Sequence, residues 1–352
     1  MTFDASLMSI STLSELLHEG QSAFLCYDLG RRVQPISTNV FQAVEQQRTP
    51  YPYPVQGHAC FALVFWPQLA TSEQDPYLWF LKFPLDERGL LEASHVQQFI
   101  TSVITLLGQQ VTHALTPEQE QQIQQSPYLF TPIEAKRAAL HAQLAQVWQR
   151  PASVHYELAL TALQQPEHWQ QVGVQGLHDV AARLAEQTQV CDAIATQFLT
   201  YPQPLRQALA AALEHQQLPP GLAQSLGRQL QQCDADAARV DLLRSVAGGI
   251  DNAEVVAGIQ HILQQPSQDE VIVCTARLWD AFDPVRQHAV PLQQLLDAMA
   301  QLPADYFAGL LSDLLRLPML RPHLLSTLQR DDLPQQIKAA WQHFTGVATH
   351  AQ

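Results

Sequence analysis

The sequence predicts a chain of two fold classes, an α+β N-terminal domain followed by an all-α domain of repeated helical hairpins, in the manner of a HEAT-like α-solenoid. Two observations predict this division. Residues 1–110 hold 14 of the 27 aromatic residues but only 12 of the 49 glutamines. Apolar positions alternate in that region, whereas after Thr116 they recur three and four apart, which is typical of amphipathic helices. We therefore expect an α+β domain over 1–110, a polar Gln-rich connection over 111–131, an α-helical repeat domain over 132–346 and a flexible tail over 347–352.

The first region predicts the order helix, hairpin, helix, hairpin, helix, with a four-stranded antiparallel sheet. Gly20 ends the first helix, and Gly30 lies in the turn of the first hairpin. Ser37 or Thr38 caps the second helix. The alternating prolines and tyrosines of residues 50–54 exclude a helix and predict an extended connection. The expected elements are helices over 10–17, 38–47 and 93–107, and strands over 23–27, 33–36, 59–66 and 77–83.

Beyond residue 116, prolines and glycines interrupt one helical apolar pattern after another. When successive helix pairs are taken to begin near residues 172, 204, 236, 269 and 304, the intervals are 32 to 35 residues. Two-helix repeats of about this length are typical of α-solenoids, because one hairpin cannot bury its apolar side without its neighbours. The pattern resembles HEAT or armadillo-like repeats in kind, and a non-repetitive helical bundle is the alternative.

Composition and charge limit the classes of molecule that the protein is expected to bind directly. Lys and Arg number 19 against 33 Asp and Glu, which gives a net charge of -14. Nucleic acids and anionic membranes attract proteins chiefly through Lys and Arg, so we expect neither as a direct partner. The first 30 residues contain no Lys or Arg, no apolar run approaches the length of a membrane span, and the five cysteines are scattered. These features predict a cytoplasmic protein with free thiols, no metal and no cofactor.

Asp28, Arg31 and Arg32 are the first candidate site, at the predicted hairpin turn. As a functional site, the two arginines would form an anion clamp, since a guanidinium grips carboxylate or phosphate with two hydrogen bonds. In the alternative interpretation, Asp28 caps its own turn and the arginines are solvated. The lack of a glycine-rich phosphate loop favours this alternative.

Tyr51, Tyr53, His58 and Lys82 complete the candidate contacts with a ligand or partner. Rigid prolines hold the two tyrosines outside regular structure, where they contact either a partner or the helical region. His58 and Cys60 share one face of a predicted strand, and a metal at this pair would need two further ligands that the nearby sequence does not supply.

In the helical region, charged and imidazole side chains predict structural roles. Asp234 and Asp236 precede an apolar helical pattern, as do Asp269 and Glu270, which indicates helix caps rather than catalytic carboxylates. The histidines of this region, such as 178, 215, 261 and 288, are not spaced as ligand pairs within one helix. We interpret them as surface or interface residues.

Three segments resemble a known family. They are 27–33 (YDLGRRV), 51–59 (YPYPVQGHA) and 79–89 (WFLKFPLDERG). Their sequences are similar to those of an uncharacterised γ-proteobacterial protein family, classed as a domain of unknown function. The resemblance covers nearly the full chain and implies a bacterial cytoplasmic protein whose α+β and helical parts occur together. It brings no assigned catalytic residues.

From these features we expect a non-catalytic cytoplasmic adaptor or scaffold that binds a protein partner through its helical repeat surface. One alternative is a small-ligand or anion-binding sensor or enzyme seated in the N-terminal α+β domain, with Arg31, Arg32, His58 and Lys82 around a pocket. A second alternative is a regulator of gene expression that acts through a protein partner. The partner, its pathway and the oligomeric state are left open by the sequence.

Overall fold

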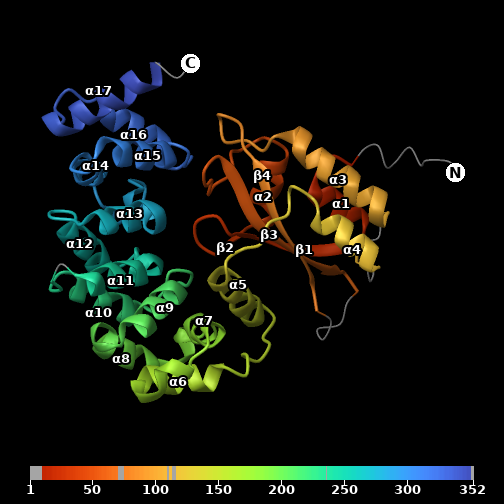
Figure 1. Cartoon of the computed structure of the whole chain (residues 1–352), viewed down its shortest axis with the longest axis horizontal. Coiled ribbons are helices and arrows are strands. Elements are labelled where there is room, and N and C mark those ends of the chain that lie inside the picture. Colours follow the sequence, from red (N-terminus) through yellow and green to blue (C-terminus); the bar gives the residue numbers. More distant parts are fainter. Residues whose placement is uncertain (1–9, 70–74, 109–110, 113–115, 235, 350–352) are drawn as a thin grey trace. The chain divides into compact units, whose positions relative to one another are not determined.

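The chain forms two compact units, Met1–Ile133 and Glu134–Gln352. The computed structural model describes residues 10–69, 75–108, 111–112, 116–234 and 236–349, with side chains described as far as 346. The first unit contains a small antiparallel sheet of four strands, and the second is built of helices (Figure 1). This confirms the predicted order of an α+β region followed by helices.

The strands of the first unit lie in the order β2, β1, β3, β4, and every neighbouring pair is antiparallel. In this register Phe24 lies opposite Phe65, and Phe61 lies opposite Leu81. Both predicted hairpins are therefore present, and the long strand of the second hairpin pairs with the first. The strands are β1 (Ser22–Asp28), β2 (Gln34–Ile36), β3 (His58–Pro67) and β4 (Tyr77–Pro84).

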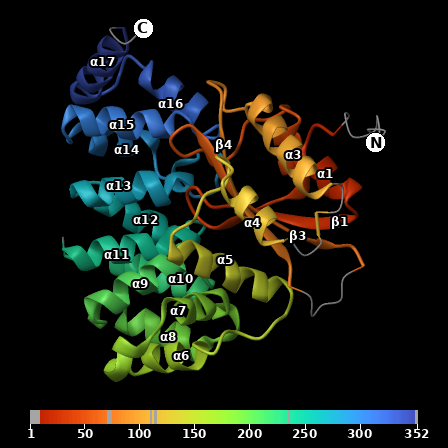
Figure 2. The ribbon, with the colours of Figure 1, turned by 45° about the vertical axis from the view of Figure 1, so that its right-hand side comes forward.

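One face of this sheet forms the core of the first unit. Side chains alternate along a strand, so Phe61, Leu63 and Phe65 share this face, and all three are buried. Three helices supply the other side of the core: α1 (Leu13–Glu19), α2 (Thr38–Glu45) and α3 (Ala93–Leu107). Figures 1 and 2 show α1 and α3 side by side against the sheet.

The helix starts of the first unit follow local capping chemistry. The Thr12 side chain accepts a hydrogen bond from the Glu15 N–H, and the Glu15 carboxylate accepts one from the Thr12 N–H, which completes a capping box. Ser37 caps α2 by accepting from the Val40 N–H, as one of the two predicted caps. The bounds of α3 coincide with the predicted 93–107.

Residues 116–131 belong to the first unit. They contain helix α4 (Pro117–Gln124), whose Ile123 lies in the core. After α4 the chain runs beside β4: the Lys82 N–H donates to the Tyr128 carbonyl, and the Phe130 N–H donates to the Phe80 carbonyl. The sequence signalled this segment only by its glutamines, because these backbone contacts need no particular side chains.

The second unit is a succession of helices. The first helices of successive pairs begin at residues 174, 203, 237, 268 and 304, each within two residues of its predicted start. The α-helices are α5 (Glu134–Val147), α6 (Tyr156–Gln164), α7 (Val174–Ala182), α8 (Thr188–Gln197), α9 (Gln203–Leu213), α10 (Pro220–Leu230), α11 (Ala237–Ser245), α12 (Ala253–Ile262), α13 (Gln268–Arg277), α14 (Leu292–Ala300), α15 (Ala304–Leu314), α16 (Arg321–Leu328) and α17 (Gln335–Thr349). Short 3-10 turns occur at Pro166–Gln171, Leu184–Glu186, Phe198–Thr200, Val246–Gly249 and Trp279–Phe282.

Two of these helices were not predicted. Helix α8 buries only Val190 and Ile194 fully, so its apolar pattern is too sparse to stand out. Helix α17 continues to Thr349, through the first half of the predicted tail, and residues 350–352 lie outside the described residues. None of the described helices has both the length and the apolar character needed to cross a membrane.

Helices of the second unit pack on their counterparts in the next pair. Helix α5 packs on α7, α7 on α9, α9 on α11 and α11 on α13, while α6 packs on α8, α8 on α10 and α10 on α12. Two glycines bring α10 and α12 close together. A Cβ atom at Gly227 would lie 2.5 Å from the Val255 nitrogen, and one at Gly258 would lie 2.7 Å from the Leu230 Cβ.

Candidate functional site

Asp28 lies at the end of β1 and is fully buried. Its carboxylate accepts hydrogen bonds from the Gly30 N–H (3.0 Å) and the Arg31 N–H (3.1 Å), which closes the turn between β1 and β2. The Tyr51 hydroxyl donates to the same carboxylate over 2.8 Å. Asp28 therefore caps its own turn, as the alternative interpretation expected, and also joins that turn to the Pro-Tyr segment.

Arg31 and Arg32 are both buried, with 2% and 7% of their surface exposed, so the expectation of solvated arginines is wrong. The Arg31 Nε donates to the Pro54 carbonyl over 3.1 Å. The turn and residues 51–55 also pack tightly at Gly30, where a Cβ atom would lie 3.0 Å from a methyl group of Val55. The contact joins segments more than twenty residues apart, which sequence spacing alone does not bring together.

Tyr51 and Tyr53 pack within the first unit. Tyr51 is fully buried in its core, and Tyr53 packs edge-on against it with ring centroids 6.5 Å apart. Burial, together with the negative charge of Asp28, raises the pKa of the Tyr51 phenol well above its ordinary value. Tyr51 is thus a neutral hydrogen-bond donor to Asp28 across the physiological range.

His58 and Lys82 lie on the sheet face opposite the Phe61 face. The ring Nδ1 of His58 lies 2.9 Å from the Gln56 carbonyl, within a tight turn closed by backbone bonds between Val55 and His58. Lys82 is exposed on β4, directly opposite Cys60 of β3. Among the described residues, no group of three or more His, Cys, Asp and Glu side chains is arranged to hold a metal.

A polar cavity of about 370 Å³ lies between α1, β1 and α2. This volume is within the range of small-molecule sites. None of its residues stands out in the sequence, because they come from three elements and form no motif. The lining consists of Thr12, Ser14, Glu15, His18, Glu19, Ser22, Phe24, Gln42, Glu45 and Gln46.

Glu45 is the most strongly perturbed group of this cavity. Its carboxylate accepts hydrogen bonds from the Leu13 N–H (2.6 Å), the Ser14 N–H (3.2 Å) and the Ser14 hydroxyl. Burial nevertheless raises its pKa from 4.5 to about 7. Burial also acts to raise the pKa of Glu15, but hydrogen bonds from Ser11 and Thr12 hold it below its ordinary value. The cavity thus pairs a carboxylate of lowered pKa with one that titrates near neutrality.

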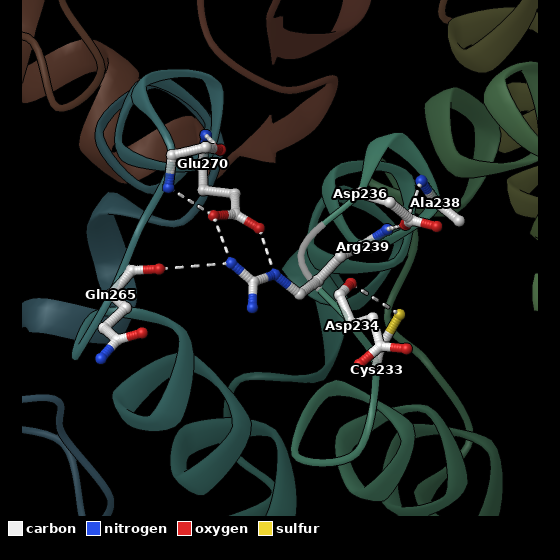
Figure 3. A network of polar contacts seen from close by, with 8 residues as sticks. Cys233, Asp234, Asp236, Ala238, Arg239, Gln265 and Glu270 are labelled. Atoms are coloured by element: carbon white, nitrogen blue, oxygen red, sulfur yellow. Dashed lines mark hydrogen bonds and ion pairs between the residues drawn. The ribbon is translucent and has the colours of Figure 1, made fainter.

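In the second unit, buried ion pairs join equivalent helices of successive pairs. Arg239 of α11 donates to both carboxylate oxygens of Glu270 on α13, and its Nη2 reaches the Gln265 carbonyl, as Figure 3 shows. Asp236 caps α11, which confirms the predicted cap. Glu270 completes the capping box of α13 with Ser267 and also pairs with Arg239. Arg206 of α9 makes the corresponding bond to Asp241 of α11 over 2.9 Å.

Glu214, just after α9, is the centre of a second buried network. Its carboxylate accepts from Arg244 of α11 and lies 3.2 Å from the Arg277 Nε of α13. The His215 Nε2 lies 3.5 Å from the same carboxylate. The Glu214 carboxylate therefore links the first helices of three successive pairs, α9, α11 and α13.

His178 of α7 stacks on His215, with ring centroids 6.0 Å apart. Both are buried between helices, so of the two roles that the sequence left open, surface or interface, these two histidines have the second. Neither ring nitrogen of His178 has a hydrogen-bond partner. Burial lowers the His178 pKa from 6.5 to about 4, with Arg244 acting in the same direction and Asp179 opposing it. Burial also lowers the pKa of His215 well below its ordinary value, helped by the positive charges of Lys136, Arg277 and Arg244.

Glutamine side chains add a third kind of link between helices. The Gln146 amide donates to the Ala182 carbonyl, and the Gln175 amide donates to the Ala138 carbonyl, so α5 and α7 are bonded at both ends. In the second helices of the pairs, Gln229 donates to the Ala195 carbonyl. The partners are 34 to 37 residues apart, about one helix pair.

A family model, described as a protein of unknown function (DUF3549), matches residues 8–345. The chain belongs to the DUF3549 family. The match spans both units, so the family is defined by the sheet-containing unit and the helical unit together. No curated protein and no solved structure matches this DUF3549 chain.

Proposed function

We propose that this DUF3549 protein is a non-catalytic adaptor or scaffold whose helical unit, arranged as a HEAT-like α-solenoid, binds a protein partner. One observation carries the proposal: side chains of several helix pairs bond to the next pair along the chain. The bonds of Arg206 with Asp241 and of Arg239 with Glu270 span 35 and 31 residues. Interactions between neighbouring repeats are what hold a solenoid together, because each repeat contacts little else.

The use of arginine supports the same proposal. Arg206 and Arg239 are buried in ion pairs with the first helix of the next pair, and Arg244 pairs with Glu214. Residues 134–352 carry 14 Lys and Arg against 21 Asp and Glu. With these arginines committed to internal bonds, the surface is rich in acid and amide groups, which suits protein recognition better than recognition of nucleic acid.

A small-ligand sensor in the first unit is the second candidate function. Its support is the polar cavity beside Glu45 rather than the predicted group of Arg31, His58 and Lys82. Regulation of gene expression through a protein partner is one form of the adaptor proposal. Identification of the partner distinguishes this form from other adaptor roles.

Site-specific photo-crosslinking in cells tests the adaptor role. A photoreactive amino acid replaces Gln189 of α8 or Gln224 of α10, both exposed, and in a matched control it replaces the exposed Thr101 of α3. We expect the same protein adduct from both helical positions and none from the control, identified by mass spectrometry. Adducts from the control position alone, or no reproducible adduct at the helical positions, would contradict the proposal.

A further inference from the structure

Glu45 is a half-buried carboxylate at the N-terminus of α1, and its hydrogen-bond partners among the described residues include no cation. All three of its hydrogen-bond donors are uncharged groups of Leu13 and Ser14. The charged side chain that acts on it is Glu15, which carries the same sign. Buried carboxylates in proteins are ordinarily paired with a cation, because desolvation of an unpaired charge is costly. Among the described residues, only the partial positive charge of the α1 N-terminus offsets the charge of Glu45.

The cavity beside Glu45 has the shape and chemistry to supply that counter-charge from outside. Its volume of about 370 Å³ suits a compact organic molecule. Its charged lining groups are Glu15, Glu19 and Glu45, with His18 as the one group of the lining able to carry positive charge. Phe24 forms an apolar wall, fixed by an edge-on contact with Phe41 at 6.0 Å. Carboxylates next to an aromatic ring attract cations that also carry an apolar chain.

We propose that this cavity binds a protonated primary amine, whose ammonium group lies against Glu45 and Glu15 and whose carbon chain lies along Phe24. The ammonium donates to the Oε1 atoms of Glu45 and Glu15, because each carboxylate oxygen accepts two bonds and both Oε2 atoms already accept at least two, from Ser14 on Glu45 and from Ser11 and Thr12 on Glu15. An amine of this kind is either a free small molecule or a lysine side chain of another protein. The site belongs to the first unit, and its occupancy does not depend on the adaptor role of the helical unit.

Binding is linked to the protonation of Glu45. The titratable groups that face it are Glu15, His18 and Glu19 of α1 and Cys26 of β1. Because burial holds the Glu45 pKa at about 7, the carboxyl must release a proton to bind an ammonium below that pH. Affinity then falls by up to about tenfold for each pH unit below about 7. The lining that the structure describes contains no Lys or Arg side chain, so His18 is its one basic side chain.

The test is calorimetric titration of the full chain with 1,4-diaminobutane, with uncharged 1,4-butanediol as the matched ligand. A second arm uses Nα-acetyl-lysine methylamide, which stands for a lysine of a partner. Tighter binding of the diamine assigns the site to a free amine, and tighter binding of the lysine derivative assigns it to a protein side chain. Binding of the diol as strongly as the diamine, or no heat from either amine up to about 10 mM, would overturn the proposal.

Two variants make the result specific to Glu45. Glu45→Gln removes the charge but keeps an oxygen that accepts from Leu13 and Ser14, so the fold is retained, and we expect at least about tenfold weaker amine binding. Glu120→Gln removes the same charge from exposed helix α4, outside the lining, and leaves the affinity unchanged. The pH dependence is measured in a His18→Gln background, which removes the imidazole from the lining. Amine affinity that is the same in Glu45→Gln and the parent chain would refute the site, and a circular dichroism spectrum confirms that each variant is folded.

Discussion

The stability of the helical unit should depend on pH through His178. This side chain is buried, with 1% of its surface exposed, and its ring nitrogens have no hydrogen-bond partners. Burial lowers its pKa to about 4 in the folded protein, against 6.5 when it is exposed in the unfolded chain. The unfolded state therefore binds more protons between these two values, so the free energy of unfolding falls as the pH decreases through this range.

The magnitude follows from the difference of about 2.5 pKa units. At about 1.36 kcal/mol per unit, protonation of His178 costs at most about 3.4 kcal/mol, of which about 3 kcal/mol is lost at pH 4 and almost none above about pH 7. His215 adds to the loss in the same direction, since its pKa is also lowered. Replacement by phenylalanine keeps the ring in place but cannot take up a proton. His178→Phe should therefore lose less stability than the parent chain on acidification.

Urea unfolding of the full chain, followed by helical circular dichroism from about pH 8 to about pH 4, measures this difference. We expect the curves of the parent chain and His178→Phe to diverge by about 3 kcal/mol at the acid end. At neutral pH the variant is as stable or more stable, because it no longer buries two unpaired ring nitrogens. His261→Phe, at an exposed position of α12, controls for the loss of a histidine. An equal fall in stability for the parent chain and His178→Phe would refute the reasoning.

Three further predictions test the packing of both units by chemical denaturation. Gly227→Ala should lower the free energy of unfolding by about 1–3 kcal/mol, because its methyl group would meet the backbone of α12 at 2.5 Å. Gly221→Ala in the same helix has open space and should be neutral or stabilising. Equal effects of the two substitutions would contradict the close contact of α10 and α12. Arg239→Met should lower the free energy of unfolding by about 3–5 kcal/mol, because it leaves Glu270 buried without its cation. Adding Glu270→Gln should recover part of that loss. If the effects of the two substitutions on stability simply add, the ion pair does not contribute as expected. Glu45 has a raised pKa, so its contribution to stability is present below about pH 4.5 and lost by about 3 kcal/mol as the pH rises through about 7; Glu45→Gln should remove this dependence, and a parent chain whose stability does not change over that range would contradict the assignment.

The elements of the first unit could be predicted because their signals are local. Ser37 and Gly30 mark a helix start and a turn, and both roles depend on neighbouring backbone groups. The Asp28 cap was recognisable for the same reason. The burial of Arg31 was not, since it depends on the Pro54 carbonyl, which lies 23 residues away.

The candidate sites divide in the same way. Among the predicted residues, Asp28, Arg31, Tyr51 and Tyr53 meet at one junction, whereas the sequence had grouped Asp28 with Arg31 and Tyr51 with Tyr53 without joining the two groups. The cavity beside Glu45 gave no sequence signal, because its lining combines one face each of α1, β1 and α2. The only available hint was that a glutamate near the end of a helix lies beside apolar neighbours, which is common in surface helices.

By itself, the sequence determined the order of the α+β and helical regions, most helix boundaries and the spacing of the helix pairs, since periodicity, prolines and caps act within a few residues. Only the tertiary structure decided which charges are buried. Arg239 with Glu270, His178 with His215, and Glu45 beside α1 each depend on contacts between residues about 30 or more apart. Exclusion of solvent at such contacts shifts the pKa of a buried group and holds a buried arginine in an ion pair. A single sequence does not show which distant segments pack together and exclude the water.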